Sequence, residues 1–278
     1  MRKIMPCMAL REGNPVYEGQ ARKEFGSRVL RGLRPSLYLS TALCSILAVL
    51  SATGAAQAQF VSTTGSVNPS IPVPVGSWGI AGDIHVGWTG TGSLNILNGG
   101  SVINDGGFIG FGTAATGSSV RVSGESPITG SRSKWKNNDD LYVGFNSRGM
   151  LTVEDGGTVS SERGVIGFAS GVSGSAEVSG KSSRGPASTW TMTDRLFVGE
   201  AGTGTLAIED GGIVKNTFGE IGKSTGSEGT ATVSGDGSIW KNSDELYVGF
   251  DGNGTLDIDL GGAVENTNGY IGTSFGSE

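Results

Sequence analysis

The sequence contains a four-copy internal repeat, and this feature constrains the fold more than any other. Aligned on Trp78, Trp135, Trp190 and Trp240, each copy has a Val-Gly pair whose glycine lies nine residues after the tryptophan. A Gly-Gly pair begins 12 residues further on, and an Ile-Gly pair ends 11 residues after that, in all four copies. Such regular spacing predicts supersecondary units that stack on one another.

The copies differ in length at one place. A Val-Ser-Gly triplet ends the first three copies, and 11, 10 and 5 residues separate it from the next tryptophan, so the repeats span 57, 55 and 50 residues. Variation confined to one point indicates a surface loop. We expect residues 125–134 and 181–189 to be solvated loops on one face of the molecule. Their basic residues are Arg132, Lys134, Lys181 and Arg184.

Each repeat consists of two similar halves rich in strand signals. Segments 246–248, 255–259 and 230–233 alternate apolar with polar residues and are separated by Gly, Asn, Asp or Ser. Superposing the copies aligns aliphatic residues in four columns: Leu94, Leu151, Leu206 and Leu256; Ile96, Val153, Ile208 and Ile258; Val102, Val159, Val214 and Val264; and Ile109, Ile166, Ile221 and Ile271. These columns are expected to point inward.

The repeat therefore predicts an all-β fold, a right-handed parallel β-helix with two coils per 50–57-residue repeat. Each coil of about 25 residues would hold three strands and three turns, with about eight coils over residues 76–278. Residues 59–75 are expected to be a linker or an N-terminal cap. A β-propeller is the alternative, against which the half-repeat symmetry counts. The 50 glycines are then turn and strand-end residues, since they lack the every-third period of collagen.

The first 58 residues have the order of a secretory signal peptide. Eight Lys/Arg and three acids precede an apolar run over 37–50, and Ala56-Gln57-Ala58 offers a cleavage site after Ala58. The run of 14 residues is shorter than the roughly 20 needed for a membrane-spanning helix. The alternative is a retained anchor. The long basic region indicates either an extended signal or a true start at Met8.

Removal of this segment would leave a cysteine-free, acidic chain. Cys7 and Cys44 both lie within it, which excludes a disulfide framework and thiolate metal sites from the remainder. Subtracting its 8 basic and 3 acidic residues from totals of 20 and 26 leaves 12 basic and 23 acidic groups. An acidic surface argues against a nucleic-acid partner.

Motifs for chemistry are weak once the repeat is known. Gly-x-Ser-x-Gly occurs around Ser224 and Ser274, in one repeat slot, and the chain has a single histidine to serve as base. That histidine, His85, stands where other copies have Tyr142, Phe197 and Tyr247, which predicts a substitute in an aromatic column. We expect no cofactor, no metal site and no catalytic residue.

Several polar residues are better explained by turns. Asp251-x-Asn253 has the opening of a calcium loop, but Leu256 occupies the position that requires glycine. Asp155 and Asp210 precede Gly-Gly pairs and are expected to form turns. Asn104, Asn216 and Asn266 share one register and predict a ladder of side-chain amides.

Aromatic residues follow the glycines of the Val-Gly and Ile-Gly pairs. They are Trp88, Phe111, Phe145, Phe168 and Phe250. One hypothesis is a strip on the surface for binding a glycan or another partner. The alternative is packing over the turn or between coils.

The segment from Trp240 to Gly262, with Ile271-Gly272 and Val233 to Gly235, resembles the repeats of autotransporter (type V secretion) passengers. The same repeat class occurs in proteins with a PEP-CTERM sorting tail. The resemblance covers about residues 76–278 and implies export by a signal peptide, passage through an outer-membrane β-barrel and a β-helical stalk at the cell surface. The chain departs from that pattern because it stops at Ser277-Glu278, inside a half-repeat of the fourth copy, with no barrel or sorting tail.

The resemblance implies a non-enzymatic passenger that is exported through the inner membrane to the cell surface, the outer membrane or the exterior. Adhesion or self-association would be its role, with a glycan or cell-surface partner. Two alternatives stay open: a carbohydrate-active β-helix enzyme, either a polysaccharide lyase or a hydrolase, and a purely structural fragment of a larger passenger. An enzyme would need carboxylates or basic residues gathered from adjacent coils, whereas the acids are dispersed among turns.

Overall fold

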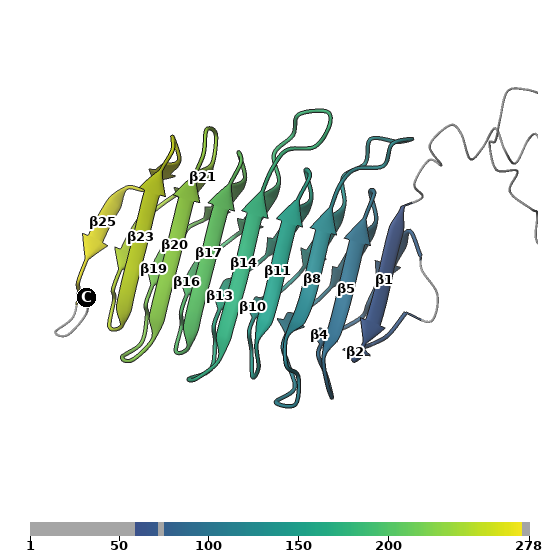
Figure 1. Ribbon diagram of the computed structural model, residues 1–278, viewed down its shortest axis with the longest axis horizontal. Helices are drawn as coiled ribbons and strands as arrows, with labels where there is room; N and C mark the ends of the chain where they lie inside the picture. Colours follow the sequence, from purple (N-terminus) through teal and green to yellow (C-terminus); the bar gives the residue numbers. More distant parts are fainter. Residues whose placement is uncertain (1–58, 72–74, 274–278) are drawn as a thin grey trace, which may run out of the picture. The chain divides into compact units, whose positions relative to one another are not determined.

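The chain forms three parallel β-sheets that wind around one apolar core. The computed structural model describes residues 59–71 and 75–273, and every regular element in this part of the chain is a β-strand. The predicted signal peptide, residues 1–58, lies outside the described residues. Figure 1 shows the strands of one sheet side by side in chain order, with the others behind them.

The three sheets are named here A, B and C. Sheet A contains β1 (Phe60–Gly65), β5 (Gly92–Leu97), β8 (Ser118–Ser123), β11 (Gly149–Glu154), β14 (Ser173–Ser179), β17 (Thr203–Glu209), β20 (Glu228–Ser234) and β23 (Asn253–Asp259). Sheet B contains β2 (Val67–Asn68), β4 (Ile84–Val86), β7 (Gly107–Ile109), β10 (Leu141–Val143), β13 (Gly164–Ile166), β16 (Arg195–Val198), β19 (Phe218–Ile221), β22 (Glu245–Val248) and β25 (Asn268–Ile271). Sheet C contains β3 (Ser77–Gly79), β6 (Ser101–Asn104), β9 (Lys134–Asn137), β12 (Thr158–Ser161), β15 (Thr189–Met192), β18 (Ile213–Asn216), β21 (Ile239–Asn242) and β24 (Ala263–Glu265).

The chain visits sheets C, B and A in turn, so three successive strands make one coil. Coil 1 is β3–β5 and coil 7 is β21–β23, while β24 and β25 begin an eighth within the described residues. Neighbouring coils pair in parallel, as between β11 and β14, but β1 and β2 run antiparallel to β5 and β4. The predicted β-helix with two coils per repeat is therefore confirmed. A propeller would need a separate sheet for each repeat, whereas these sheets run through all the coils.

The core consists of side-chain columns that cross the coils. In sheet A one column runs Leu94, Val120, Leu151, Ala176, Leu206 and Ala231, all at most 1% exposed. The predicted leucine column is thus confirmed, but its members are not adjacent. Side chains on one face of parallel strands in register share a column. Successive strands of sheet A come from alternate halves of the repeat, so a smaller residue from the other half separates one leucine from the next.

Tryptophan and glycine explain why the repeat needs two coils. Trp135, Trp190 and Trp240 are fully buried on sheet C. Each indole extends over a sheet-B glycine of the preceding coil, and a Cβ added to Gly164 would lie 2.7 Å from Cζ2 of Trp190. A Cβ added to Gly107 would lie 2.9 Å from Cζ2 of Trp135. A coil with a bulky tryptophan therefore requires a neighbour with glycine, since protein interiors are close-packed.

Buried amides line the corner between sheets C and B. Asn104 accepts a hydrogen bond from Trp135 Nε1 at 2.7 Å and donates to Asn137 Oδ1 at 2.8 Å. Trp240 donates likewise to Asn216 at 2.7 Å, and Asn216 donates to Asn242 at 2.6 Å. The predicted amide ladder is confirmed at these two positions, while Asn266 is exposed in the last coil. The indole N–H groups are thereby satisfied inside the core.

The turns from sheet A to sheet C use two successive left-handed residues. Asp155 and Asp210 have φ values of 50° and 51°, and the glycines that follow them both have 83°. This is the pattern of a type I′ turn, which favours Asn or Asp followed by Gly. The predicted turn role of these carboxylates is confirmed, with the addition that the aspartate itself adopts the left-handed conformation.

Candidate functional site

Aromatic side chains gather on the outer side of sheet B over coils 1–4. We call this set the aromatic strip, and its members are His85, Trp88, Phe108, Phe111, Tyr142, Phe145 and Phe168. Some come from the middle of β4, β7 and β10, and the others follow the glycine that ends each sheet-B strand. That glycine has positive φ, as at Gly110 with 74°, where a Cβ would lie 2.2 Å from the Ser147 carbonyl oxygen. The corner therefore requires glycine and fixes where the next ring begins.

The rings of the aromatic strip form two parallel stacks. In one, ring centroids lie 5.0 Å apart for Trp88 and Phe111, 5.5 Å for Phe111 and Phe145, and 4.9 Å for Phe145 and Phe168, with planes within 9°. In the other, His85 stacks on Phe108 and Phe108 on Tyr142, at 5.1 and 5.0 Å. Edge-to-face contacts join the stacks, such as Phe108 to Phe145 at 5.0 Å.

This geometry covers most ring faces. Phe111 and Phe145 have a ring on both faces, so each presents an edge to solvent and is half-buried. Phe168, the last ring of this stack, is also half-buried. Trp88 ends its stack and is 41% exposed. Stacked pairs contribute about 0.5–1.5 kcal/mol each beyond area burial. The strip consequently holds coils together, and Trp88 is its accessible end.

Phe250 is not part of the aromatic strip. It packs edge-on against Tyr247 at 5.3 Å, and Tyr247 stacks on Tyr270 at 4.9 Å. The Tyr247 hydroxyl donates to Glu245 at 2.7 Å, which raises the pKa of Tyr247 to about 12. Four of the five aromatic residues singled out in the sequence therefore lie in one stack, and Phe250 belongs to a second aromatic group in coils 7 and 8.

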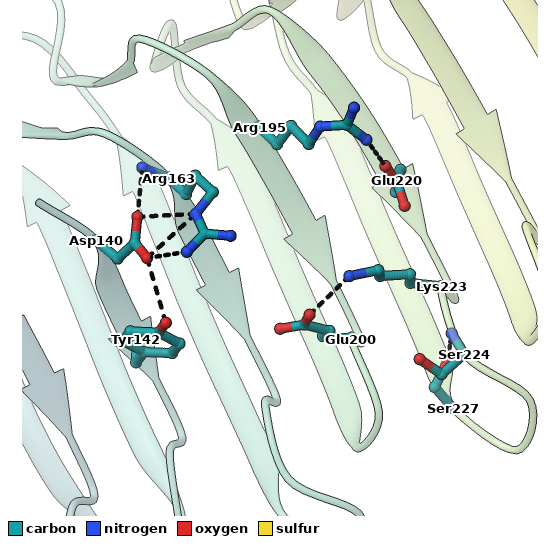
Figure 2. A network of polar contacts seen from close by, with 9 residues as sticks. All are labelled: Asp140, Tyr142, Arg163, Arg195, Glu200, Glu220, Lys223, Ser224 and Ser227. Carbon is teal, nitrogen blue, oxygen red and sulfur yellow. Dashed lines mark hydrogen bonds and ion pairs between the residues drawn. The ribbon is translucent and has the colours of Figure 1, made fainter.

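Charged residues enter these columns in coils 5 and 6, where Glu200 and Lys223 follow Phe168 in one column and Glu220 follows Phe197 in the other. Figure 2 shows Lys223 paired with Glu200 and Arg195 paired with Glu220, at 2.7 and 2.6 Å. The Lys223 ammonium also lies 4.0 Å from the centroid of the Phe197 ring. The Glu220 side chain is only 5% exposed, so its contact with Arg195 is the more buried side of this ion pair. We call Arg195, Glu200, Glu220 and Lys223 the ion-pair segment.

A further polar group lies beside the aromatic strip. Arg163 forms a bidentate pair with Asp140, with Nε at 3.0 and 3.1 Å from the two carboxylate oxygens, and this bond raises the pKa of Arg163 further above its ordinary value. Tyr142 donates from its hydroxyl to Asp140 at 3.2 Å, as Figure 2 shows. All three groups are partnered, so this cluster has a structural role.

His85 takes the role that the sequence predicts for it. Its ring stacks on Phe108 and meets Trp88 and Phe111 edge-on, at 4.8 and 4.2 Å. Its Nδ1 atom is buried and has no hydrogen-bond partner. Burial lowers the pKa of His85, an effect that the nearby Asp83 carboxylate partly opposes. A neutral ring in a column of aromatic rings is therefore its ordinary state.

The two long loops contact each other on the side where sheet A turns into sheet C. Arg132 of the first loop donates to the Ala187 carbonyl and to Thr189 Oγ1, the latter at 3.1 Å. In return, Arg184 of the second loop pairs with Glu125 at 3.0 Å. The predicted placement on one face is confirmed. Both arginines are engaged between the loops rather than free for a partner.

The described residues contain no group of three or more His, Cys, Asp or Glu side chains able to hold a metal ion. Ser224 lies in a turn where its backbone N–H donates to Ser227 Oγ at 3.1 Å, and no helix follows it. Ser274 lies outside the described residues. No helix in the described part of the chain is long and apolar enough to cross a membrane.

Sequence reasoning missed Phe108, and it did not connect the column of His85 and Tyr142 with the rings that follow the glycines. Phe108 and Tyr142 lie two residues before the glycine of an Ile-Gly or Val-Gly pair, the same position that His85 occupies. Aligning whole repeats separates Phe108 from Tyr142, because they belong to different half-repeats. Aligning half-repeats would have placed His85, Phe108 and Tyr142 in one column.

Comparison with known proteins gives one informative match. The chain is similar to the adhesin BmaC autotransporter of Brucella suis biovar 1 (strain 1330), with 35% identity over 83 residues. This stretch is 30% of the present chain and 2% of the length of that protein. No protein-family model and no solved structure matches the chain. The match supports an autotransporter passenger-like protein of the adhesin type.

Proposed function

We propose that the chain is a non-enzymatic passenger segment, exported and exposed at the cell surface, that contributes to adhesion or self-association as a β-helical stalk. The observation that carries this proposal is the similarity to an autotransporter adhesin, in a chain whose described coils are uniform and stacked. A rigid solenoid displays long surfaces, which suits many weak contacts.

Within this function, we assign the partner contact to the aromatic residues of sheet B. Trp88 is the best placed of them because 41% of its surface is exposed at the end of a stack. Amphipathic rings at an accessible end suit a glycan or a protein on a neighbouring cell.

Surface display tests the adhesive role. The whole chain is fused to a heterologous translocator and displayed on bacteria that do not aggregate, and we measure sedimentation and attachment to cultured cells. The expected result is faster sedimentation or greater attachment than with the translocator alone. Unchanged sedimentation and attachment, at antibody-verified display, contradict the proposal.

A matched pair of variants tests the aromatic contact. Trp88→Ala removes the exposed stack end, whereas Ile128→Ala removes another exposed apolar side chain, 73% exposed in the first loop. We expect Trp88→Ala to reduce attachment and Ile128→Ala to leave it unchanged. Equal attachment by both variants would place the contact elsewhere.

A further inference from the structure

The outer face of sheet C carries a hydroxyl-lined trough on coils 4 and 5. Thr158, Ser160, Thr189 and Thr191 of β12 and β15, together with Lys134 of β9, line a shallow hollow of about 300 Å³. It arises because two neighbouring coils place only small side chains outward there. The Ser160 and Thr191 hydroxyls have no hydrogen-bond partner among the described residues, whereas Thr158 and Thr189 bond to Ser133 and Arg132.

Lysines stand at both ends of this trough. The strand register places Lys136, Ser160, Thr191 and Lys215 in one outward column, on four successive coils. Three strand spacings separate the two lysines, a distance of about 14 Å. Lys134 is next to this column on β9, and Lys134, Lys136 and Lys215 are all exposed.

These three lysines are unpaired in an acidic chain. None of them forms an ion pair within the described residues, in contrast to Arg163, Arg195, Lys223 and Lys241. The outward positions of β9, β12, β15 and β18 hold no acidic residue. Glu265, on the more distant β24, is paired with Lys241. This face of sheet C is therefore locally positive, and no ion pair within the described residues accounts for its three lysines.

We propose that this face binds an acidic polysaccharide lying along the stack of coils. Carboxylate or sulfate groups would pair with Lys134, Lys136 and Lys215, and sugar hydroxyls would bond to Ser160 and Thr191. The outward positions of these four strands carry no aromatic ring, which disfavours single-stranded nucleic acid, since its bases need rings to stack on. The proposal names a ligand class and a face distinct from the aromatic residues of sheet B, and it holds independently of the adhesive role.

Binding of the purified chain to three polymers provides the test. Heparin supplies sulfate groups, polygalacturonate supplies carboxylates alone, and dextran is uncharged. We expect binding to heparin, polygalacturonate or both, weakening as salt is raised, and none to dextran. Binding to heparin alone would identify sulfate as the recognised group, and binding to polygalacturonate alone would identify carboxylate. Absence of binding to both acidic polymers would overturn the proposal.

Variants locate the site. Lys136→Gln with Lys215→Gln should weaken binding about tenfold, because each exposed charge contact contributes modestly. The control, Arg121→Gln with Arg148→Gln, removes two positive charges from elsewhere on the surface and should leave affinity nearly unchanged. Thr191→Val keeps the shape and charge of the trough and should weaken binding two- to threefold, by loss of about one hydrogen bond.

Two results would overturn the assignment. An equal loss in the control pair would mean that only net charge matters. Binding of single-stranded DNA as tight as that of heparin would mean a general polyanion surface rather than a polysaccharide site. Failure of the cell-attachment test together with heparin binding that depends on Lys136 and Lys215 would contradict the adhesive role and support this inference.

Discussion

The outer side of sheet B solves one structural problem in two ways. In coils 1–4 the stacked rings of the aromatic strip lie in two columns, whereas in coils 5 and 6 Glu200 and Lys223 occupy the first of these columns and Glu220 follows Phe197 in the second. Arg195 reaches Glu220 from the neighbouring column. Phe168 and Glu200 are successive residues of one column, although one side chain is an aromatic ring and the other a carboxylate. Both residues nevertheless follow a glycine with positive φ, 71° at Gly167 and 76° at Gly199, and both donate a backbone N–H to the equivalent glycine of the preceding coil.

Both kinds of side chain at these positions contact the next coil. Neighbouring coils lie one strand spacing apart, close enough for flat rings to stack and for a long cation to reach a carboxylate. Either contact joins adjacent coils. They differ in their response to solvent, because salt screens exposed ion pairs but leaves ring stacking largely unaffected. The stack of coils should therefore have a salt-sensitive section between two insensitive ones.

The largest difference is expected from truncating one position in each region. Phe145→Ala removes a half-buried ring together with its stacking contacts to the rings on either side. It should lower the free energy of unfolding by about 2–3 kcal/mol. Lys223→Ala, in the same column, removes a partly exposed pair and should cost about 1 kcal/mol or less. Urea unfolding with hydrogen exchange of the local strands measures both. Equal losses would mean that the two regions contribute alike.

The buried carboxylate of the ion-pair segment gives the next effect. Glu220→Gln keeps the side-chain shape but removes the charge that Arg195 faces, and should destabilise by about 1–2 kcal/mol. Glu265→Gln is the control, since its pair with Lys241 is half exposed on both sides and should contribute little. We would compare unfolding midpoints at low and high salt. A loss from Glu265→Gln as large as that from Glu220→Gln would contradict the role of burial.

Replacing the charged residues of one column by rings tests whether the two kinds of contact are interchangeable. Glu200→Phe with Lys223→Phe would extend the stack from Phe168 toward Phe250, and should stabilise the chain by about 1 kcal/mol and remove part of its salt sensitivity. Each single variant should be less stable than the double, because it leaves one charge without its partner. Denaturant melts of all four proteins form a double-mutant cycle. A coupling near zero would show that the rings do not stack.

Most of the fold was predictable from the sequence, because fixed spacing in four copies left few architectures. The Trp-Gly alternation between coils was not predicted, since Gly107 and Trp135 belong to different half-repeats and meet only once the register is known. Of the five aromatic residues singled out in the sequence, Trp88, Phe111, Phe145 and Phe168 lie in one stack of rings, and their role in binding a partner stays a prediction. Phe250 lies outside that stack because Glu200 and Lys223 occupy the two intervening positions of the column. Sequence alignment shows which positions are equivalent but not which side chains touch.

The smallest expected effect is a pH dependence confined to the aromatic strip. Burial among the rings lowers the pKa of His85 in the folded chain, so between that value and the ordinary value near 6.5 the unfolded chain binds more protons. The contribution of His85 to the free energy of unfolding is therefore fully present above about pH 6.5. It decreases as the pH falls toward the pKa of the folded chain. His85→Phe keeps a ring in the stack and removes the proton site. Melting temperatures at neutral and mildly acidic pH should fall more for the original chain than for His85→Phe. An identical decrease in melting temperature for the two proteins would mean that His85 has the same pKa in the folded and unfolded chains. It would then contradict the burial of His85 within the aromatic strip.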